Sequence, residues 1–494
     1  MTLPEEFSKY TRELFGEELW QQFVKVLDEE PPVSIRLNPF KFDAATMPLP
    51  AEEDGEVEWC PEGRYLKSRP QFTLDPLLHA GAYYVQEAAS MYVARVLRRH
   101  ADMSSPLRVL DLCAAPGGKT TTARSVLPEG SLLMANEPMR PRANILMENM
   151  QKFGHPDVIV TNNYAIDYQR SGLQFDVIIC DVPCSGEGMF RKDEGAIGEW
   201  SVANVKKCAA LQREIIADIM PCLRDGGLLI YSTCTFNAHE DEENVKWITD
   251  TYDMQLLDIS DENMKLSTLS PLGEPEGAVG ALHFIPGVTR TEGLFMAAMR
   301  KPGEGNNLMA TSADRKKEKK QKRGKQMKQQ PVQGAKQVAE WLSDSGDFDI
   351  TMLGGRIVGV KKMWRNVFDT ACDKLRVMHA GVELGEQKGK DIIPSESLAL
   401  SISLNREAFP IAELDRNAAL DYLRREPIAL PADMPRGYVV VSYMGLALGF
   451  VKNLGNRTNN LFPQEWRIRK GPIPAQPLAA SPSPKGEGSR YSGI

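Results

Sequence analysis

Residues 107–120 read LRVLDLCAAPGGKT and decide the fold. The apolar run 107–112 predicts a short buried strand, and the glycines that follow it lie where a helix would begin. Glycine lets the backbone approach a ligand closely, and the first turn of a helix has free N–H groups that can bind it. The spacing matches neither a Walker loop nor a full G-x-G-x-x-G. The stretch therefore predicts a strand–loop–helix unit of an open α/β sheet, with a ligand at the loop.

Further apolar runs downstream end in polar side chains. Glu137 follows the run 131–135, at the place where doubly wound nucleotide binders carry the acid that accepts hydrogen bonds from ribose hydroxyls. This position favours an adenosine-bearing cofactor. Asn163 follows the next run and Asp181 the one after it. Because ligands gather at the carboxyl ends of parallel strands, we expect these side chains to line one crevice.

Two cysteines, Cys184 and Cys234, also follow strand-like runs, at 175–180 and 227–231. A free cysteine is most often a buried packing residue. However, Pro183 and the Ser/Thr-rich flanks of Cys234 are typical of exposed exits from a strand into a loop. We therefore expect the two thiols to face the same crevice.

Three of these motifs, in order, resemble the signature of the Nol/Nop/Sun family of RNA cytosine-5 methyltransferases. They are residues 111–120, DVPCSGEG at 181–188 and STCT at 232–235. Segments 34–39 and 80–87 are similar to the family too. The resemblance implies a Rossmann-like core that binds S-adenosylmethionine, with Cys234 as nucleophile, Cys184 as second cysteine and Asp181 as a partner of the target base. The cofactor-binding residues that it implies are Cys113, Ala114, Ala115, Pro116, Gly117, Gly118, Lys119, Glu137, Asn163 and Asp181.

The implied reaction explains why two thiols are needed. Carbon-5 of cytosine is a poor nucleophile, and a thiolate that adds to carbon-6 increases the electron density at carbon-5. The adduct must then lose the carbon-5 proton and expel the sulfur, which requires a base, and Cys184 is the candidate. An ordinary thiol has a pKa of about 8.5, so we expect positive charge or oriented N–H donors near Cys234.

Composition predicts a cytoplasmic protein. The 494 residues are 42% hydrophobic, enough for two to four domains with their own cores. Eight cysteines without a pairing pattern or a signal peptide predict reduced thiols. No apolar run approaches the roughly 20 residues of a membrane span, and no close His/Cys group resembles a zinc site. We therefore predict no membrane and no metal, and a monomer.

Basic charge is concentrated in one segment. The formal net charge is -7, but residues 315–328 hold nine Lys/Arg and one Glu, a local +8 that leaves -15 for the remainder. This segment is either a solvated spacer or a flexible arm that binds RNA phosphates. Outside it, the residues predicted to contact RNA are Arg191, Lys192, Lys452 and Arg467.

The predicted fold class is α/β, a Rossmann-like methyltransferase core flanked by two RNA-binding modules. Short strands are predicted at 356–360, 375–377 and 398–404, and a β-hairpin at 437–451. This hairpin resembles the PUA-like RNA module found in the methyltransferase F branch of bacterial enzymes for small-subunit ribosomal RNA. The predicted divisions are an N-terminal α/β RNA-binding module (1–74), the methyltransferase domain (75–302), a basic flexible linker (303–334), a mixed α/β C-terminal region ending in a PUA-like domain (335–470) and a disordered tail (471–494).

The resulting functional prediction is an S-adenosylmethionine-dependent enzyme that forms 5-methylcytosine in 16S ribosomal RNA, on the small subunit or its precursor. Two alternatives stay open. One is a transfer RNA substrate, and the other is a non-catalytic RNA-binding protein of ribosome assembly with a vestigial site. The presence of both cysteines, the glycine loop and Glu137 argues against a vestigial site.

Overall fold

The computed structural model describes residues 1–260, 281–305 and 332–469. At its centre lies a sheet with the strand order β10-β12-β9-β8-β5-β6-β7-β15, with β11 paired to β12. The strands β9, β8, β5, β6 and β7 are parallel to their neighbours in this series. Their bounds are β5 Arg108–Asp111, β6 Leu132–Asn136, β7 Val158–Thr161, β8 Phe175–Asp181 and β9 Leu223–Thr233; the antiparallel strands are β10 Gln255–Leu257, β11 Ala281–Phe284 and β12 Leu294–Arg300.

The strand order creates a crevice at a defined place. From β5 the chain builds β6 and β7 on one side and then returns to place β8 and β9 on the other. In open α/β sheets such a reversal leaves a ligand-binding crevice at the carboxyl ends of the two central strands. Here those strands are β5, which precedes the glycine loop, and β8, which precedes Cys184. The predicted Rossmann-like core is confirmed.

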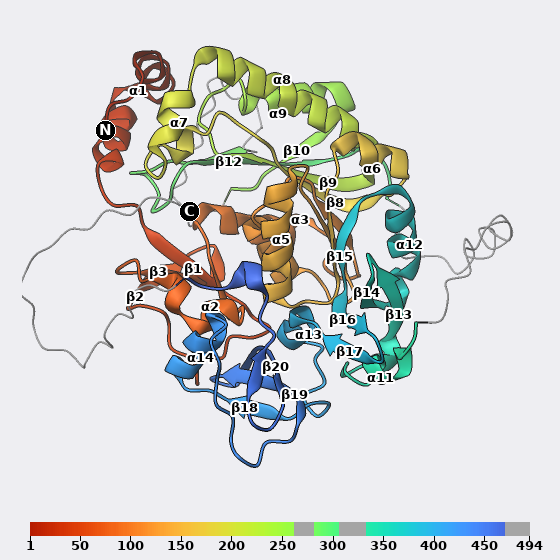
Figure 1. The fold of residues 1–494 in the computed structure, drawn as a ribbon. Coiled ribbons are helices and arrows are strands. Elements are labelled where there is room, and N and C mark those ends of the chain that lie inside the picture. The colour runs from red at the N-terminus through yellow and green to blue at the C-terminus, as the bar shows by residue number, and fades with distance from the viewer. Residues whose placement is uncertain (261–280, 306–331, 470–494) are drawn as a thin grey trace, which may run out of the picture.

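Helices cover both faces of the sheet, as Figure 1 shows. Alternate strand residues point to opposite faces: Leu110 packs in one apolar core and Val109 in another. The first core contains residues of α6, α8 and α9, and the second contains residues of α3 and α4. The helices are α3 Val93–His100, α4 Gly118–Val126, α5 Arg140–Phe153, α6 Ala165–Ser171, α7 Glu194–Glu199, α8 Val202–Ile219 and α9 Glu242–Tyr252.

The N-terminal module comprises a long helix and a small sheet. The sheet has the order β2-β3-β1-β4, and because β4 pairs with β1 the module continues past the predicted boundary at residue 74. Buried Arg36 of β1 donates hydrogen bonds to Gln86 and to Thr121 of α4, which fixes the module on the core. The elements are α1 Glu5–Leu27, β1 Val33–Leu37, β2 Glu53–Val57, β3 Cys60–Leu66, α2 Pro76–His79 and β4 Tyr83–Val85.

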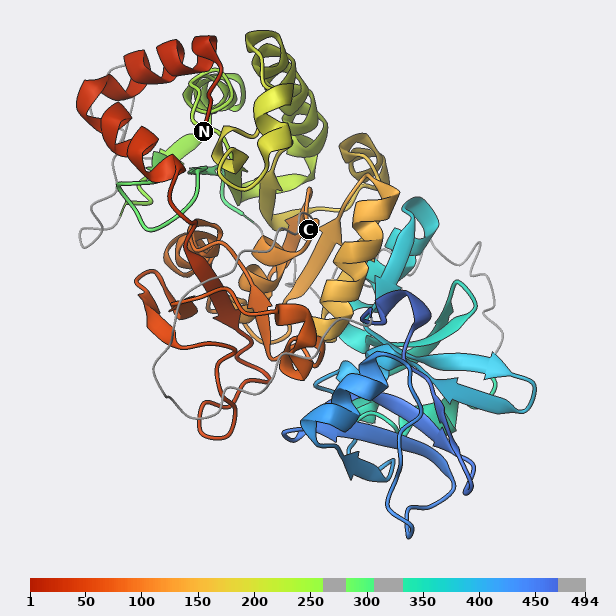
Figure 2. The ribbon, with the colours of Figure 1, turned by 60° about the vertical axis from the view of Figure 1, so that its left-hand side comes forward.

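The C-terminal region lies at the other end of the molecule from α1 (Figure 2). It contains two four-stranded sheets, β13-β14-β16-β17 and β18-β19-β20-β21, while β15 adds to the edge of the central sheet beside β7. The hairpin β19–β20 confirms the predicted one. The elements are α11 Ala335–Ala339, β13 Phe348–Leu353, β14 Arg356–Lys361, α12 Arg365–Lys374, β15 Val377–Ala380, β16 Val382–Lys388, β17 Asp391–Pro394, α13 Glu396–Leu400, β18 Ile411–Glu413, α14 Arg416–Leu423, β19 Gly437–Tyr443, β20 Leu446–Asn453 and β21 Thr458–Asn460.

One strand prediction in this region was wrong. Residues 398–404 begin inside α13, whose N-cap Ser395 accepts a hydrogen bond from the N–H of Ser397. Leu398, Ala399 and Leu400 are all buried, so this run is apolar on every side and its periodicity does not separate helix from strand. The predicted basic segment 315–328 and the tail 471–494 lie outside the described residues. Among the residues that are described, no helix is long and apolar enough to cross a membrane.

Candidate active site

The two thiols meet at the carboxyl ends of neighbouring strands. Cys184 follows β8 and Cys234 follows β9, and their Sγ atoms lie 3.1 Å apart as free thiols. The backbone N–H of Cys234 donates a hydrogen bond of 3.3 Å to the Cys184 sulfur. Both side chains are partly exposed. The expectation that both thiols face one crevice is confirmed.

The contact with Cys234 keeps Cys184 protonated. The hydrogen bond to Cys234, followed by burial, raises the pKa of Cys184 well above its ordinary range. A thiol with a raised pKa carries its proton near neutrality. The resting site therefore has a neutral thiol at Cys184, ready to donate to its neighbour.

A lysine from the glycine loop supplies positive charge at the same place. Lys119 Nζ lies 3.0 Å from Asp181 Oδ2, and Ser232 donates a hydrogen bond of 2.7 Å to the other oxygen of Asp181. Burial acts to lower the pKa of Lys119, but Asp181 and Cys234 outweigh it, so its pKa lies above the ordinary value. Lys119 is therefore a permanent cation beside both Cys234 and Asp181.

Glu187 fixes the loop that carries Cys234. Its Oε2 accepts hydrogen bonds from the Thr235 hydroxyl at 2.6 Å and from the backbone N–H of Phe236 at 2.8 Å. Its Oε1 accepts from the Trp200 indole and from the Asn237 amide. Glu187 belongs to the Cys184 motif, so its carboxylate ties one cysteine loop directly to the other.

Glu240 performs the reciprocal task for the Cys184 loop. It accepts hydrogen bonds from the backbone N–H of Ser185 at 3.0 Å, from Gln212 at 2.7 Å and from Asn237 at 2.8 Å. Gln212 also donates to the carbonyl of Pro183, the residue before Cys184. The 3.1 Å spacing of the two thiols thus depends on two buried, fully hydrogen-bonded carboxylates.

Replacing Glu240 by alanine should destabilise the protein. Three buried donors would each lose one acceptor, and the Ser185 N–H would have none, so we expect the free energy of unfolding to fall by about 2–4 kcal/mol. Chemical denaturation measures this, with the exposed Glu129→Ala as the matched control. An unfolding midpoint equal to that of the control would show that Glu240 does not brace the loops.

The two glycines at the start of α4 differ in what they permit. Gly117 has φ +116° and is the N-cap of α4, and a Cβ there would lie 2.8 Å from Met150 Cε. At Gly118 a Cβ would be in ordinary van der Waals contact with Gln86 and Tyr84, whose nearest atoms lie at 3.6 Å. Gly118 can therefore accommodate a small side chain, whereas the backbone requires glycine at position 117.

Glu137 ends β6 with an unused acceptor. Its Oε1 accepts a hydrogen bond of 2.9 Å from the N–H of Met139, but its buried Oε2 has no hydrogen-bond donor. The guanidinium of Arg142 lies 3.5 Å from that oxygen and also donates to the carbonyl of Ala115 in the glycine loop. A free carboxylate oxygen beside the glycine loop fits a ribose hydroxyl of an adenosine cofactor.

Two other residues of the crevice ionise less readily than usual. Burial raises the pKa of Asp111 to about 7, and its Oδ2 accepts a hydrogen bond of 2.6 Å from Thr120. Burial also raises the pKa of the Cys113 thiol. Both lie beneath the loop rather than beside the two reactive thiols, since they belong to β5 and its end.

Asn163 is occupied by the C-terminal region. Its Oδ1 accepts a hydrogen bond of 3.0 Å from the N–H of Arg376, and its Nδ2 donates to the Arg376 carbonyl. Arg376 directly precedes β15. Asn163 therefore holds β15 against β7, and its side chain is not free for a cofactor in this arrangement, which argues against the predicted contact.

The basic residues predicted to contact RNA divide into two groups. Arg191 is buried, pairs with Glu292 at 2.6 Å and donates to the carbonyl of Val26, so burial argues against the predicted phosphate contact. Lys192 and Arg467 are exposed. Lys452 lies over the ring of Tyr438, with its ammonium 5.0 Å from the ring centroid. These three remain candidates for RNA contact.

A buried cluster supports the Cys234 loop from below. Asp241, Glu242 and His283 place potential ligand atoms within 4.8 Å of one another in the described part of the chain. His283 pairs with Glu242 at 2.7 Å, and Asp241 accepts a hydrogen bond from Thr233, which precedes Cys234. The cluster braces the loop, and the absence of a metal stays a prediction.

Sequence reasoning missed Glu187, Glu240 and the charge role of Lys119. Glu187 lies inside the Cys184 motif, and the acidic run 240–243 follows Cys234 closely. Acidic residues so near two thiols could have indicated that these carboxylates belong to the site. Their burial, however, depends on Trp200 and Gln212, and no local sequence pattern connects these two residues to the carboxylates.

The sheet order, the glycine loop and the paired thiols define a methyltransferase with a Rossmann-like core. Comparison with known sequences agrees. The family described as 16S rRNA methyltransferase RsmB/F matches residues 95–300, the N-terminal domain of 16S rRNA methyltransferase RsmF matches 3–88, and the RsmF PUA domain matches 409–468.

Similar proteins extend over nearly the whole chain. The Cronobacter sakazakii protein named ribosomal RNA small subunit methyltransferase F is 31% identical over 96% of this chain and 98% of its own length. Its namesake from Shewanella loihica is 30% identical over 87% and 88%. The chain belongs to the ribosomal RNA small subunit methyltransferase F family. A solved structure of a Pyrococcus horikoshii methyltransferase homologue, 26% identical with a TM-score of 0.51, covers 60% of this chain and 95% of its own.

Proposed function

We propose that this protein is an S-adenosylmethionine-dependent RNA (cytosine-5-)-methyltransferase that acts on 16S ribosomal RNA. The observation that carries the proposal is the 3.1 Å contact between two free thiols at adjacent strand ends. One thiol can add to carbon-6 of cytosine while the other removes the proton from carbon-5. The reaction needs both of these steps. A ribosomal RNA substrate would also place the protein in the cytoplasm.

The crevice beside the thiols fits the cofactor. Glu137 would accept hydrogen bonds from the ribose, and the backbone at Gly118 would approach the ligand closely. When bound, S-adenosylmethionine supplies a methyl group on a positively charged sulfur. Asp111 and Cys113 contribute to the walls of the crevice.

Cys234 begins the reaction by adding to the base. Its thiolate forms a bond from Sγ to carbon-6, and the electron pair of the carbon-5–carbon-6 double bond moves onto carbon-5 and the ring. Lys119, which is charged and coupled to Cys234, favours the thiolate. Asp181 would accept a hydrogen bond from the amino group of cytosine, with Lys119 stabilising the negative charge that develops at N3.

Cys184 completes the reaction by removing the proton from carbon-5. Its raised pKa arises first from the hydrogen bond with Cys234. Once the Cys234 sulfur is bonded to carbon-6, it no longer shares a hydrogen-bonded proton with Cys184, so Cys184 can release its own proton to water and act as the base. It takes the carbon-5 proton, the electron pair of the carbon-5–hydrogen bond re-forms the carbon-5–carbon-6 double bond, and the carbon-6–sulfur bond breaks with its electron pair returning to Cys234.

The substrate is tested by sequencing bisulfite-treated total RNA from cells with and without this protein. We expect one or more protected cytosines in 16S ribosomal RNA to lose protection when the protein is absent and to regain it on complementation. Loss of protection only in transfer RNA would establish the alternative substrate. No change in any RNA would favour the non-catalytic assembly protein.

Cofactor binding provides a separate prediction. We expect Glu137→Ala to weaken S-adenosylmethionine binding by about 10- to 100-fold, because a hydrogen bond to a charged group contributes roughly 1.5–3 kcal/mol. Gly118→Ala should weaken it without disturbing the fold, since a Cβ there has only ordinary contacts with the protein. Gly117→Val is less informative, because the positive φ strains any other residue.

Calorimetry measures both affinities, with Glu129→Ala as a matched exposed control. Each variant is first checked for a wild-type melting temperature. Wild-type affinity in both folded variants would remove the cofactor from this crevice.

A further inference from the structure

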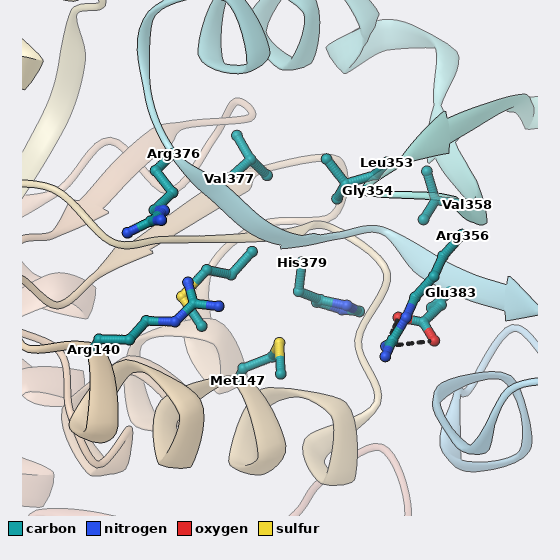
Figure 3. A pocket seen from close by; sticks show the side chains of 11 residues that line it. Arg140, Met147, Leu353, Gly354, Arg356, Val358, Arg376, Val377, His379 and Glu383 are labelled. Carbon is teal, nitrogen blue, oxygen red and sulfur yellow. Dashed lines mark hydrogen bonds and ion pairs between the residues drawn. The ribbon is translucent and has the colours of Figure 1, made fainter.

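A cavity of about 300 Å³ lies where the methyltransferase core meets the C-terminal region. One wall is α5, which contributes Arg140 and Met147, and the other is built from the strands β13 to β16. Figure 3 shows Arg140 and Arg376 at one end of the cavity and the Arg356–Glu383 pair at the other, with Met147 and His379 between them. The volume is at the lower end of the range for small-ligand sites.

The lining is positively charged in a protein whose net charge is negative. It contains three arginines against one glutamate, a net charge of +2, whereas the whole chain carries -7. His379 adds no charge near neutrality, because burial lowers its pKa below the ordinary value. The cavity therefore attracts anions.

Two of the three arginines are available to a ligand. Glu383 is satisfied by Arg356, which donates to both of its oxygens at 2.8 and 3.0 Å. Arg140 has no hydrogen-bond or ion-pair partner among the described residues, and the guanidinium of Arg376 reaches only the amide oxygen of Asn162, at 3.4 Å. Guanidinium groups without a carboxylate partner suit the paired oxygens of a phosphate.

The start of α5 adds to this preference. Arg140 is the first residue of a 14-residue helix whose first turn has no acidic side chain and whose N-cap, Met139, makes no side-chain cap. Free N–H groups and the helix dipole make such an end favourable for an anion. The charge is therefore concentrated where Arg140 and Arg376 lie.

The rest of the lining is apolar. Met147, Val377 and Val358 offer methyl and thioether surface between the charged ends. A site with cations at one end and an apolar floor fits a nucleotide, with its phosphate on the arginines and its base on the floor. An inorganic anion would make no contact with these apolar side chains.

The position of the cavity relates it to the active site. Arg140 lies three residues after Glu137, and Arg376 is hydrogen-bonded to Asn163 at the end of β7. Cys234 follows β9, and four inter-strand spacings separate β9 from β7. At about 4.8 Å for each spacing, the distance between these two strands is roughly 19 Å. An RNA strand that enters the active site would reach the cavity with a nucleotide away from the target cytosine.

We propose that this cavity binds a nucleotide of the RNA substrate outside the target cytosine, with Arg140 and Arg376 on its phosphate. The proposal rests on the proposed function, because it assumes an RNA substrate. It assigns part of substrate selection to the junction between the core and the C-terminal region, so that both units must be correctly docked for RNA to be held.

The test is the double variant Arg140→Gln/Arg376→Gln with a fluorescent fragment of 16S ribosomal RNA. We expect its affinity to fall about 10- to 100-fold and the slope of log affinity against log salt to decrease by roughly 0.7–0.9, the contribution of one phosphate contact. Affinity for S-adenosylmethionine should stay at the wild-type value. Arg140→Lys/Arg376→Lys should keep most of the salt slope.

The matched control is Arg98→Gln/Arg170→Gln, which removes the same charge from the last turns of α3 and α6, the helices that precede the amino ends of β5 and β8. Wild-type affinity and slope in the pocket variant, or an equal loss in the control, would overturn the proposal. Micromolar binding of free cytidine monophosphate that is lost in the pocket variant would overturn it in favour of a mononucleotide site. Failure of the wild-type protein to methylate any RNA would instead remove the proposed function.

Discussion

Cys234→Ala should abolish methyl transfer, with a loss of at least about 10⁴-fold, and should leave no covalent protein–RNA species. The nucleophile itself is missing in this variant, so carbon-6 is never attacked. Cys184→Ala should behave in the opposite way. Cys234 can still attack and the base can still be methylated, but removal of the carbon-5 proton fails, so a stable protein–RNA adduct accumulates.

Denaturing gel electrophoresis with labelled substrate RNA distinguishes the two variants directly. Cys372→Ala, which removes an exposed thiol far along the chain, is the control and should behave as wild type. An adduct or efficient turnover with Cys234→Ala would reverse the roles of the two cysteines. Two inactive variants without adduct would contradict the role of Cys184 as the base, provided that both melt at the wild-type temperature.

The sequence predicts the parts of this site that depend on local pattern. The run at 107–112 contains a strand, and the glycines after it form a loop and the start of a helix. A short buried apolar run is typical of a strand, and a glycine pair directly after it is typical of a loop. The positions of Cys184 and Cys234 follow from the same logic, since each comes directly after a buried run. Their contact at 3.1 Å then results from the pairing of β8 with β9.

Other parts of the site depend on partners that are distant in the chain. Arg191 and Lys192 form a basic pair of a kind that is usually exposed. However, the Arg191 side chain is buried because it pairs with Glu292, about 100 residues later in the chain. Asn163 likewise meets Arg376, because β15 adds to the edge of the sheet at β7. Local composition carries no information about either pairing.

The boundary of the N-terminal module shows the same limit. The sequence predicted that the module ends at residue 74, but β4 at 83–85 pairs with β1. Strand pairing is decided by the sheet and not by the segment between its strands. The module therefore shares its last strand with the region where the core begins, which helps to explain why Arg36 reaches α4.

Asp181→Asn should reduce the turnover number by about 10²- to 10³-fold, the range found when one preorganised electrostatic group is removed. The substitution keeps the size of the side chain and removes the charge that pairs with Lys119 and accepts from Ser232. Lys119→Met should have a comparable effect, because it removes the cation beside Cys234. Both variants should bind the RNA with nearly wild-type affinity, since the missing interactions matter most while charge develops on the base.

A Cys184→Ala background isolates the step that Asp181 serves. In that background the reaction stops at the covalent adduct, before the RNA is released. The rate of adduct formation therefore reports the attack by Cys234. We expect Asp181→Asn to slow adduct formation by the same factor as it slows turnover, and the exposed Asp433→Asn to leave it unchanged. If adducts formed at the parent rate, Asp181 would act after the attack, and the charge that Lys119 and Asp181 share would serve the cofactor rather than the cytosine.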